Sequence, residues 1–525
     1  MDNLAAYSIS ALVQAAANGF GDKTCAIAPD RTVTFRQFGD DVAAIAAHLE
    51  RLGIGPGDRV AILDVNSLNF LETLCALGAL GAIAVPLNYR QRLPEYQFQI
   101  EDSGARLLLA NARYGAEAAE LVSSPALPLE LGWRAIDDPA QIGLPGTSFD
   151  TAPGTPDGLI RLTSHDPATP LAICYTSGTT GRPKGAVIDQ FTASLRAFKL
   201  MYDLRLGPDD VMHMTTPMFH ISCLMLSLAA LQRGAAQLIL PQFDYETTFA
   251  SLRQHNVTFI NTVPTILSMA LARDDFTPDV LAGLRLIMYT AAPMSLPLLR
   301  KLMSVYKGDL VQFLGQTEDL PQTVLTPEDH HNALAGIAPG RLQSIGQPSA
   351  GVDLAICDDG GKPVPRGEIG EIVTRAGTAM SGYWNLVGET AATLKDGWIH
   401  TGDLGRQDSD GYVYLAGRKK HMIIRGGENV YPSEVEPVLL EAPGVRDAVI
   451  LGLEDETWGE IVVAAVTCDN DDGDIGDAEA IIGHCKKHLA SYRCPERIYF
   501  VNEMPLNAAG KVLRHVLLAQ ITEQG

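Results

Sequence analysis

The first half of the chain alternates between two hydrophobic periodicities, and this alternation limits the folds that are open to it. Residues 38–53 (FGDDVAAIAAHLERLG) place apolar side chains at helical spacing, and residues 58–65 (DRVAILDV) then have the composition of a strand. A second helical run at 70–82 leads to a second strand-like run at 83–88. Strands that alternate with helices usually lie parallel in one sheet, with the helices on its faces. The pattern therefore predicts an α/β fold with largely parallel sheets.

The character of the sequence changes near residue 345. Residues 351–376 and 410–418 are short strand-like runs between Gly, Asp and Pro turns, which predict a small antiparallel barrel or sandwich. After the basic cluster that contains Lys420, strand-like and helical runs mix again. A chain of 525 residues is also too long for one ordinary core. We therefore expect a large N-terminal domain at 1–419, built of layered α/β subdomains plus the small β-barrel, and an α+β C-terminal domain at 420–525.

The charge balance excludes some classes of partner. The chain has 40 Lys and Arg against 62 Asp and Glu, a net charge of −22, and such a surface repels nucleic acid and anionic lipid. The longest apolar stretch, 74–87, is shorter than the roughly 20 residues that span a bilayer. The N-terminus lacks a signal-peptide pattern, and the scattered cysteines form no CxxC pair. We expect a cytoplasmic protein with no nucleic-acid or membrane partner, and the sequence leaves open whether it is a monomer or a homodimer.

Residues 175–185 (YTSGTTGRPKG) have the composition of a phosphate-binding loop without the P-loop spacing. Glycines let backbone N–H groups turn toward an anion, and the hydroxyl groups add donors. A generic run of this kind is ordinarily a polar loop, but eleven residues in this order resemble the phosphate loop of the adenylate-forming superfamily. The resemblance implies that ATP phosphates are bound by Thr176, Ser177, Gly178, Thr179, Thr180, Gly181 and Lys184.

Further segments follow in the order of that family. Residues 315–318 (GQTE) resemble its GxTE segment, which implies that Gly315 and Gln316 line the ATP site. Thr317 would then contact phosphate and Glu318 would hold Mg²⁺. A carboxylate suits Mg²⁺, which prefers hard oxygen ligands shared with phosphates. Alone, this carboxylate would be read as a solvated turn residue.

The nucleoside and the catalytic lysine are assigned by the same resemblance. YTAAPM (289–294) is similar to the strand and turn along adenine, so Ala291, Ala292 and Pro293 would contact the base. The TGD segment would place Asp403 on the ribose hydroxyls, as a carboxylate can bind two neighbouring hydroxyls. Two basic residues are assigned with it: Arg418 would contact ribose or phosphate, and Lys511, in PLNAAGKVLR (505–514), would be the catalytic lysine.

The region between the domains resembles the segment about which the small domain rotates in this family. Lys420 occupies the hinge position, and the loop that follows would meet the pantetheine arm of CoA through Arg425, Gly426, Gly427 and Glu428. Glycines suit a close approach because they carry no Cβ. In the alternative interpretation the Gly-Gly pair only makes a turn.

The resemblance covers most of the chain and implies a two-step ligase. An acid and ATP would give an acyl-adenylate and pyrophosphate, and the thiol of CoA would then give acyl-CoA and AMP. Residues 217–223 contain no acidic residue to hold an amino group, and 14 residues follow Lys511, too few for a carrier domain. We therefore expect a stand-alone acyl-CoA synthetase. A carrier-protein thiol as acceptor, a non-turnover protein that binds acyl-AMP or CoA, and a luciferase-like oxygenase remain as alternatives.

The acid would lie in a mostly apolar pocket. His220 matches the position that guards the carboxylate end of the pocket and is assigned to catalysis. The remaining pocket residues are, by resemblance, Ile221, Met225, Val263, Tyr289, Thr290, Leu314 and Gln322. Their composition predicts an acid with an apolar tail, which could be fatty, aryl, alicyclic or polycyclic.

Three positions depart from the family pattern. Leu314 stands where a tyrosine usually lies along adenine, His421 replaces an acidic residue after the hinge, and Gln190 replaces a common histidine. None of them removes a group that the chemistry requires, but they raise the question of atypical nucleotide handling.

Overall fold

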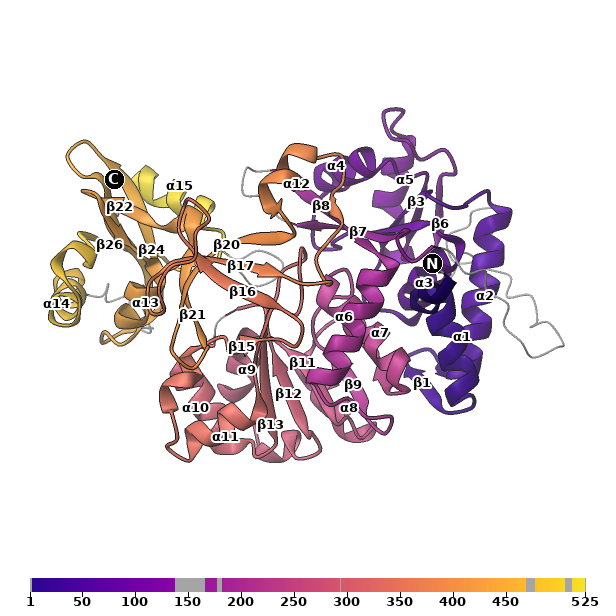
Figure 1. Cartoon of the computed structure of the whole chain (residues 1–525), viewed down its shortest axis with the longest axis horizontal. Coiled ribbons are helices and arrows are strands. Elements are labelled where there is room, and N and C mark those ends of the chain that lie inside the picture. Colours follow the sequence, from indigo (N-terminus) through magenta and orange to yellow (C-terminus); the bar gives the residue numbers. More distant parts are fainter. Residues whose placement is uncertain are drawn as a thin grey trace. The chain divides into compact units, whose positions relative to one another are not determined.

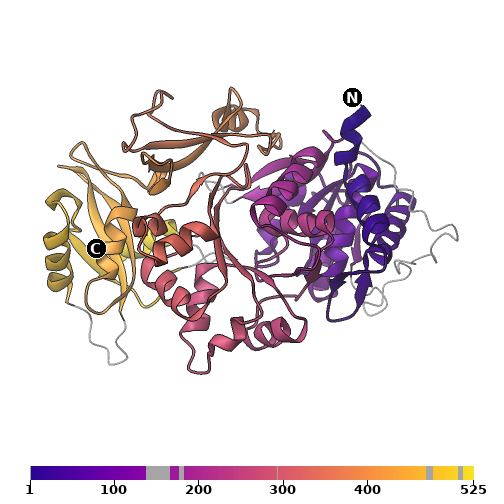
Figure 2. The same ribbon diagram turned by 60° about the horizontal axis from the view of Figure 1, so that its bottom comes forward.

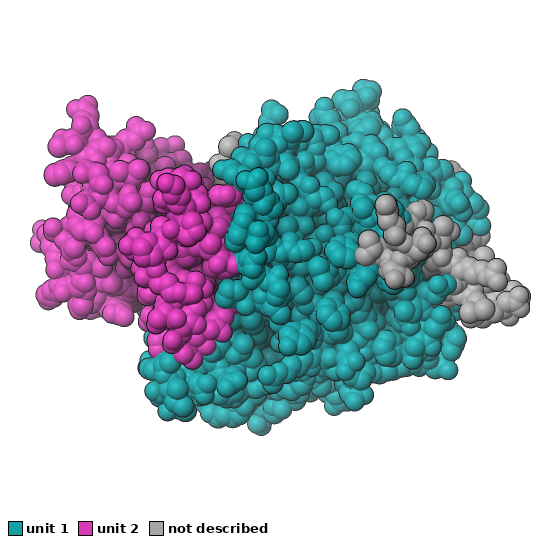
Figure 3. Space-filling view, viewed as in Figure 1, with its two compact units in different colours: residues 1–339, 348–353, 375–399 teal, residues 340–347, 354–374, 400–525 magenta. Residues whose placement is uncertain are grey.

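A computed structural model describes residues 2–136, 166–176, 182–292, 294–468, 477–505 and 512–524. These residues form two compact units, drawn in different colours in Figure 3. Unit 1 comprises 1–339, 348–353 and 375–399, and unit 2 comprises 340–347, 354–374 and 400–525. The predicted α/β class, with a large N-terminal part and a smaller C-terminal part, is confirmed. The boundary at 419/420 and the hinge at Lys420 stay predictions.

Unit 1 contains a seven-stranded sheet of mainly parallel strands. Its order is β18 (Gly382–Tyr383), β8 (Lys184–Asp189), β7 (Pro170–Thr176), β4 (Ile83–Pro86), β3 (Arg59–Leu63), β5 (Leu107–Ala110) and β6 (Trp133–Ala135). The pairs from β7 to β6 are parallel, whereas β7–β8 and β8–β18 are antiparallel. The central strands β3, β4 and β5 are almost wholly buried, as their continuous apolar sequences require when helices cover both faces.

A nine-stranded sheet holds most of the predicted nucleotide segments. Its order is β15 (Gln347–Pro348), β14 (Thr323–Leu325), β13 (Asp309–Leu314), β12 (Leu286–Tyr289), β11 (Phe259–Thr262), β9 (Val211–Met214), β10 (Ala236–Leu238), β1 (Thr24–Ile27) and β2 (Thr32–Thr34). The strands from β13 to β1 pair in parallel, and β14 and β2 pair antiparallel with their neighbours. Parallel strands align their carboxyl ends, where open α/β sheets bind ligands.

The helices of unit 1 follow these strands in the alternation that the sequence predicts. They are α1 (Ile9–Phe20), α2 (Phe35–Arg51), α3 (Leu68–Leu80), α4 (Leu93–Ser103), α5 (Gly115–Ser123), α6 (Gln190–Asp203), α7 (Ile221–Arg233), α8 (Tyr245–Gln254), α9 (Pro264–Leu271), α10 (Leu296–Val305), α11 (Pro327–Leu334) and α12 (Val387–Thr393). Helices α6 and α7 pack on each other and on α1, and both ribbon views place the indigo N-terminal helices beside the magenta ones (Figures 1 and 2).

Helix ends in unit 1 coincide with local capping signals. Thr34 caps α2 through a capping box with Gln37, and Ser67 caps α3 by accepting a hydrogen bond from the backbone N–H of Phe70. Helix α3 stops at Gly81, whose φ of 68° lies in the left-handed region that glycine enters without strain. Asp189 caps α6, so this helix begins directly at the end of β8.

Unit 2 is built mainly on β-strands, three of which have 10 or 11 residues. One sheet, most of whose residues belong to unit 2, has the order β16 (Asp353–Cys357), β17 (Gly370–Arg375), β20 (Trp398–Gln407) and β19 (Leu394–Lys395), with β21 (Val413–Arg418) paired to β20. The other has the order β23 (Glu428–Val430), β22 (Ile423–Arg425), β25 (Gly459–Cys468) and β24 (Val445–Asp455), with β26 (Arg497–Phe500) paired to β25. Its helices are α13 (Pro432–Leu440), α14 (Ala478–His488) and α15 (Arg514–Gln524).

The cysteines and the helix lengths bear on two expectations from the sequence. None of the eight cysteines forms a disulfide, and seven of them are buried. No helix within the described ranges is long and apolar enough to cross a bilayer.

Candidate active site

The turn after β13 holds the GQTE residues in a fixed backbone conformation. The backbone N–H of Gln316 donates to the carbonyl of Asp319 over 2.8 Å, and the N–H of Asp319 donates back to Gln316 over 3.2 Å. A Cβ on Gly315 would lie 2.7 Å from the Cβ of Leu320, so the turn requires glycine there. The Asp319 side chain is fully buried and accepts a 2.7 Å hydrogen bond from Thr378 Oγ1. The turn is therefore anchored on the protein side.

A tyrosine from a distant segment binds the half-buried carboxylate of Glu318. Tyr383, in β18, donates its hydroxyl to Glu318 Oε1 over 2.5 Å. Burial, and then the charge of Glu318, raise the pKa of Tyr383, so the phenol stays protonated and can donate. The backbone N–H of Met380 also donates to the carbonyl of Glu318 over 2.7 Å. Both the backbone and the carboxylate of Glu318 are thus held.

The predicted phosphate lysine lies beside this tyrosine. Lys184 begins β8 and stands opposite Thr176, the last residue of β7. Its ammonium group pairs with Glu389 over 2.8 Å and lies 4.7 Å from the centre of the Tyr383 ring. The fold therefore brings Lys184 and Glu318 to one tyrosine, the lysine over its ring and the glutamate at its hydroxyl. The predicted loop residues Ser177, Gly178, Thr179, Thr180 and Gly181 lie outside the described residues.

A buried arginine that no motif contains also reaches the GQTE turn. Arg196 lies in α6 with none of its surface exposed, and its guanidinium donates to the carbonyls of Thr317, Glu318 and Thr378 over 3.0, 3.0 and 2.8 Å. Burial lowers the pKa of Arg196, against the opposing effect of the nearby Asp319 carboxylate, but a guanidinium has so high an ordinary pKa that the group remains charged. The sequence signal that could have identified it is helical spacing, because Arg196 lies on the same face of α6 as the buried Ala193.

The predicted adenine segment follows the neighbouring parallel strand. Strand β12 ends at Tyr289 and pairs with β13, so residues 290–292 and the GQTE turn follow two adjacent carboxyl ends. Thr290 Oγ1 donates to the carbonyl of Phe313 over 3.1 Å. Ala291 has a φ of 72°, a strained conformation for a residue with a side chain and one that recurs at functional sites. Ala292 is half-buried and Pro293 lies outside the described residues.

The predicted ribose-binding pair lies in unit 2. Asp403 in β20 is the register partner of Arg418 in β21, and Arg418 Nε lies 2.5 Å from Asp403 Oδ1. The backbone N–H of Gly402 donates to the Glu371 carboxylate over 3.1 Å, which holds the TGD turn from the strand next to it. The carboxylate assigned to ribose is largely buried and carries a permanent cation beside it.

The assigned acyl-pocket residues fall into two groups. Ile221 and Met225 are buried in α7, in the same apolar cluster as Phe313, and His220 precedes this helix with its ring 4.4 Å from that of Phe219. The second group follows the carboxyl ends of strands or the β13 turn: Val263, Thr290 and Leu314 are half-buried, and Tyr289 and Gln322 are buried.

The hydroxyl of Tyr289 makes a hydrogen bond to another side chain of the protein. It lies 2.9 Å from Nε2 of His330, whose Nδ1 lies 2.7 Å from the carbonyl oxygen of Thr326. A carbonyl can only accept, so Nδ1 carries the proton, Nε2 accepts, and Tyr289 donates. Burial lowers the pKa of His330 to about 4, which keeps the imidazole neutral. The proton of the Tyr289 hydroxyl is therefore not available for donation to an acyl group.

Acid should destabilise the protein through His330. Its pKa is 6.5 ordinarily and about 4 in the fold, so between these values only the unfolded chain takes up this proton. The free energy of unfolding should thus fall as the pH drops from about 6.5 to about 4, by up to about 3 kcal/mol from this group. Denaturant titrations of His330→Gln should show a shallower loss over this range than the native chain. The exposed neighbour His331, changed to Gln, is the control; parallel curves for the native chain and His330→Gln would contradict the assignment.

The predicted hinge and CoA residues lie along one stretch of unit 2. Lys420 is exposed, and the pKa of the following His421 is lowered to about 4, first by burial and then by the charges of Arg514, Lys420 and Arg418. A neutral imidazole therefore stands where the family carries an acid.

The Gly-Gly pair makes the tight turn between β22 and β23. Gly426 and Gly427 have φ values of 58° and 88°, and Arg425 and Glu428 are register partners across the turn. A two-residue hairpin with both φ positive selects glycine by itself. Arg425 donates to the carbonyl of Tyr492 over 3.1 Å. The two glycines therefore make a turn, as the alternative interpretation states. Their contact with pantetheine stays a prediction.

The other departures from the family pattern occupy different environments. Gln190 is fully buried; its Oε1 accepts from the N–H of Ile9 over 2.8 Å and its Nε2 donates to the carbonyl of Gly78 over 2.9 Å. These bonds tie α6 to α1 and α3, so the residue has a structural role. Leu314 is half-buried at the end of β13, beside the predicted adenine segment. The predicted catalytic Lys511 lies outside the described residues.

Comparisons with known proteins agree along most of the chain. The family described as AMP-binding enzyme matches residues 13–384, and the AMP-binding enzyme C-terminal domain matches 434–511. The chain is 35% identical over 493 residues to an indoleacetate–CoA ligase of Aromatoleum aromaticum, with 93% of each chain covered. It is 34% identical over 503 residues to a fatty acid–[acyl-carrier-protein] ligase, ScoC of Streptomyces coeruleorubidus, with 93% and 91% covered.

A solved structure extends the similarity to the fold. The o-succinylbenzoate CoA synthetase of Bacillus subtilis, in complex with its acyl-adenylate intermediate, has a TM-score of 0.82 to this chain at 28% identity. The match covers 96% of this chain and 97% of that one.

Proposed function

The chain belongs to the AMP-binding enzyme family, and we propose that it is an ATP-dependent ligase that joins an apolar carboxylic acid to coenzyme A. The observation that carries this proposal is the 35% identity, over 93% of both chains, to a ligase of that reaction class. The site supports it, because Lys184, expected to bind phosphate, lies over the ring of Tyr383, and Glu318, expected to hold Mg²⁺, accepts from the hydroxyl of the same tyrosine.

The first step makes the acid reactive. A carboxylate is a poor electrophile because its leaving group would be oxide. One carboxylate oxygen attacks the α-phosphorus of ATP, the bond from that phosphorus to the bridging oxygen breaks, and pyrophosphate leaves with the electron pair. Lys511 is proposed to bring the carboxylate and the α-phosphate together, and residues 176–184 to bind the phosphates that leave. Such catalysis depends mainly on positioning and on neutralising charge.

The residues present fit a magnesium ion that arrives with ATP. Mg²⁺ commonly takes one or two protein carboxylates and completes its coordination with water and substrate phosphates. Glu318 is a half-buried carboxylate held by one hydroxyl donor, and the described part of the chain has no group of three or more His, Cys, Asp or Glu that could hold a metal alone. Glu318 would hold the ion, which supplies neutralising charge to the phosphates.

The second step transfers the acyl group. The CoA thiol gives up its proton, its sulfur attacks the acyl carbonyl carbon, and the bond from that carbon to the phosphate oxygen breaks so that AMP leaves. We propose that residues beyond Lys420 rotate between the steps, which removes Lys511 and brings the 425–428 turn to pantetheine. Asp403 and Arg418 are proposed to hold the ribose throughout.

The acid is proposed to have an apolar tail. Ile221 and Met225 are buried among apolar side chains, and the Tyr289 hydroxyl already donates to His330. Without that donor, the mostly apolar pocket set has few groups with which to recognise a polar substituent. The relatives act on an indole acid and on fatty acids, which are both apolar.

A carrier-protein thiol is the competing acceptor, because one relative is named for that reaction. A panel of aliphatic, aryl and polycyclic acids tests both. Pyrophosphate should form only with ATP, Mg²⁺ and a suitable acid, and CoA should become acylated. Pyrophosphate without acid, or none across the panel, would contradict the ligase. Acylation of a carrier protein in preference to CoA would select the alternative.

The cytoplasmic location and the oligomeric state stay predictions.

A further inference from the structure

We propose that Arg196, which no motif of the chain contains, is the positioning residue of the Glu318 carboxylate. The proposal rests on the proposed function, because Glu318 is the carboxylate expected to hold Mg²⁺ with ATP. Arg196 acts through the backbone of two segments and not by touching substrate. One of these segments carries Glu318, and the other carries the tyrosine that binds it.

The guanidinium joins the two segments directly. Two of its nitrogens, Nη1 and Nη2, each donate over 3.0 Å to the carbonyls of Thr317 and Glu318 in the GQTE turn. Its Nε donates over 2.8 Å to the carbonyl of Thr378, five residues before Tyr383. No other donor in protein side chains has a rigid fork that can reach three acceptors in this way.

A second link runs parallel to the first. The buried Asp319 carboxylate accepts from Thr378 Oγ1 over 2.7 Å, and Asp319 also forms an isolated β-bridge with Ala379. Asp319 is the principal opposing charge to Arg196. A buried charge is costly unless it is compensated, and here the guanidinium donates to three carbonyls while Asp319 supplies a nearby opposite charge. These contacts join α6, the GQTE turn and residues 378–379 to one another.

These links fix the position of the Glu318 carboxylate relative to the Tyr383 hydroxyl that donates to it. Glu318 receives its backbone position from the turn, and Tyr383 receives its position from the 378–383 segment. Their side chains meet at 2.5 Å. If Arg196 is removed, the two segments lose their common anchor, and the carboxylate no longer has one preferred position for a metal. Residues that orient a metal ligand in this way typically change metal affinity about 10- to 100-fold when mutated.

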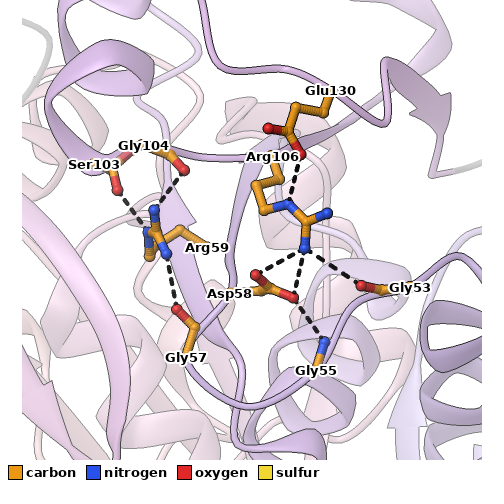
Figure 4. A network of polar contacts seen from close by, with 9 residues as sticks. All are labelled: Gly53, Gly55, Gly57, Asp58, Arg59, Ser103, Gly104, Arg106 and Glu130. Carbon is orange, nitrogen blue, oxygen red and sulfur yellow. Dashed lines mark hydrogen bonds and ion pairs between the residues drawn. The ribbon is translucent and has the colours of Figure 1, made fainter.

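Arg59 provides a matched control within unit 1. It also donates to three backbone carbonyls, those of Ser103, Gly104 and Gly57, over 2.7, 2.8 and 3.0 Å (Figure 4). Beside it, Arg106 pairs with Asp58. None of these residues belongs to the predicted active site. The Arg59 guanidinium also lies 5.9 Å from the centre of the Trp384 ring. Replacing Arg59 therefore removes the same kind of bonds, together with this ring contact, and leaves the bonds to Thr317, Glu318 and Thr378 in place.

The first test uses the protein without metal or nucleotide. Amide hydrogen exchange is compared in the native chain, Arg196→Gln and Arg59→Gln. Arg196→Gln should speed exchange in residues 315–319 and 378–383, whereas Arg59→Gln should speed it near residues 57, 103, 104 and 384 and leave residues 315–319 unchanged. Unchanged exchange in both active-site segments of Arg196→Gln would overturn the proposal. This readout does not depend on the reaction that the protein catalyses.

The second test measures ATP binding by calorimetry over a series of Mg²⁺ concentrations. The Mg²⁺ needed for half-maximal binding should rise about 10- to 100-fold in Arg196→Gln and stay unchanged in Arg59→Gln. Equal requirements in the two variants would mean that Arg196 only stabilises the fold, which overturns the proposal. If the native chain itself binds no Mg·ATP, the proposed function fails, and hydrogen exchange still decides on Arg196.

A conservative variant covers the case in which Arg196→Gln does not fold. Arg196→Lys keeps the charge but loses the fork, so it should fold and give a Mg²⁺ requirement between those of the native chain and Arg196→Gln. Added methylguanidinium should restore part of the affinity in Arg196→Gln. A Mg²⁺ requirement in Arg196→Lys equal to that of the native chain would count against the need for the fork.

Discussion

Replacing Lys511 with alanine is expected to lower acid-dependent pyrophosphate formation by about 10²- to 10³-fold, the usual loss when one charge-stabilising donor is removed. Thiolysis of a supplied acyl-adenylate by CoA should remain largely intact. The physical reason is that the ammonium group is needed only while a carboxylate approaches the α-phosphate, since two anions must then meet. Once the adenylate exists, that repulsion is gone and the second step has no use for the lysine.

The two half-reactions must be measured separately. Pyrophosphate release reports the first, and AMP release from a synthetic acyl-adenylate with CoA reports the second. Lys487→Ala is a suitable control, because Lys487 is an exposed lysine on α14 of the same unit. Equal losses in both half-reactions for Lys511→Ala would rule out the proposed rotation about Lys420.

The second large effect is expected for Glu318→Gln. The substitution keeps the size of the side chain and its ability to accept from Tyr383, but it removes the negative charge that suits Mg²⁺. Pyrophosphate formation should fall by about 10²- to 10³-fold, and the Mg²⁺ concentration needed for half-maximal rate should rise at least about tenfold. A rate measured over a Mg²⁺ series separates the two effects.

Two further variants calibrate that result. Glu328→Gln changes an exposed carboxylate at the start of α11 and should behave as the native chain. Tyr383→Phe removes only the hydroxyl donor and should raise the Mg²⁺ requirement by less than Glu318→Gln does. A Glu318→Gln enzyme with native Mg²⁺ dependence would exclude this carboxylate as the metal ligand.

The fold was predictable where one physical signal dominates. The strand-like run at 58–65 appears as β3, Arg59–Leu63, and the helical run at 38–53 appears as α2, Phe35–Arg51. Both are strongly periodic, and α2 also has a capping box at its start. The offset at the helix start arises because Thr34 caps the helix before the apolar periodicity becomes clear.

The contacts that assemble the site were beyond sequence reasoning. Lys184 and Glu389 are 205 positions apart, and nothing local in either stretch indicates that they pair. Tyr383 and Arg196 carry no motif of their own, because a hydroxyl or guanidinium in a helical or strand-like run is ordinarily a surface group. Their roles depend on which strands become neighbours. Motif order identified the segments, and only the fold identified what holds them.

The reaction class is tested most directly by following an oxygen atom. The substrate acid is labelled with ¹⁸O in both carboxylate oxygens and converted with ATP, Mg²⁺ and CoA. If the carboxylate attacks the α-phosphorus, one labelled oxygen must remain on phosphorus when the thiol displaces the phosphate. The account therefore predicts AMP that carries one ¹⁸O and pyrophosphate that carries none. Unlabelled AMP, or ADP with label in inorganic phosphate, would contradict an acyl-adenylate and with it the proposed ligase.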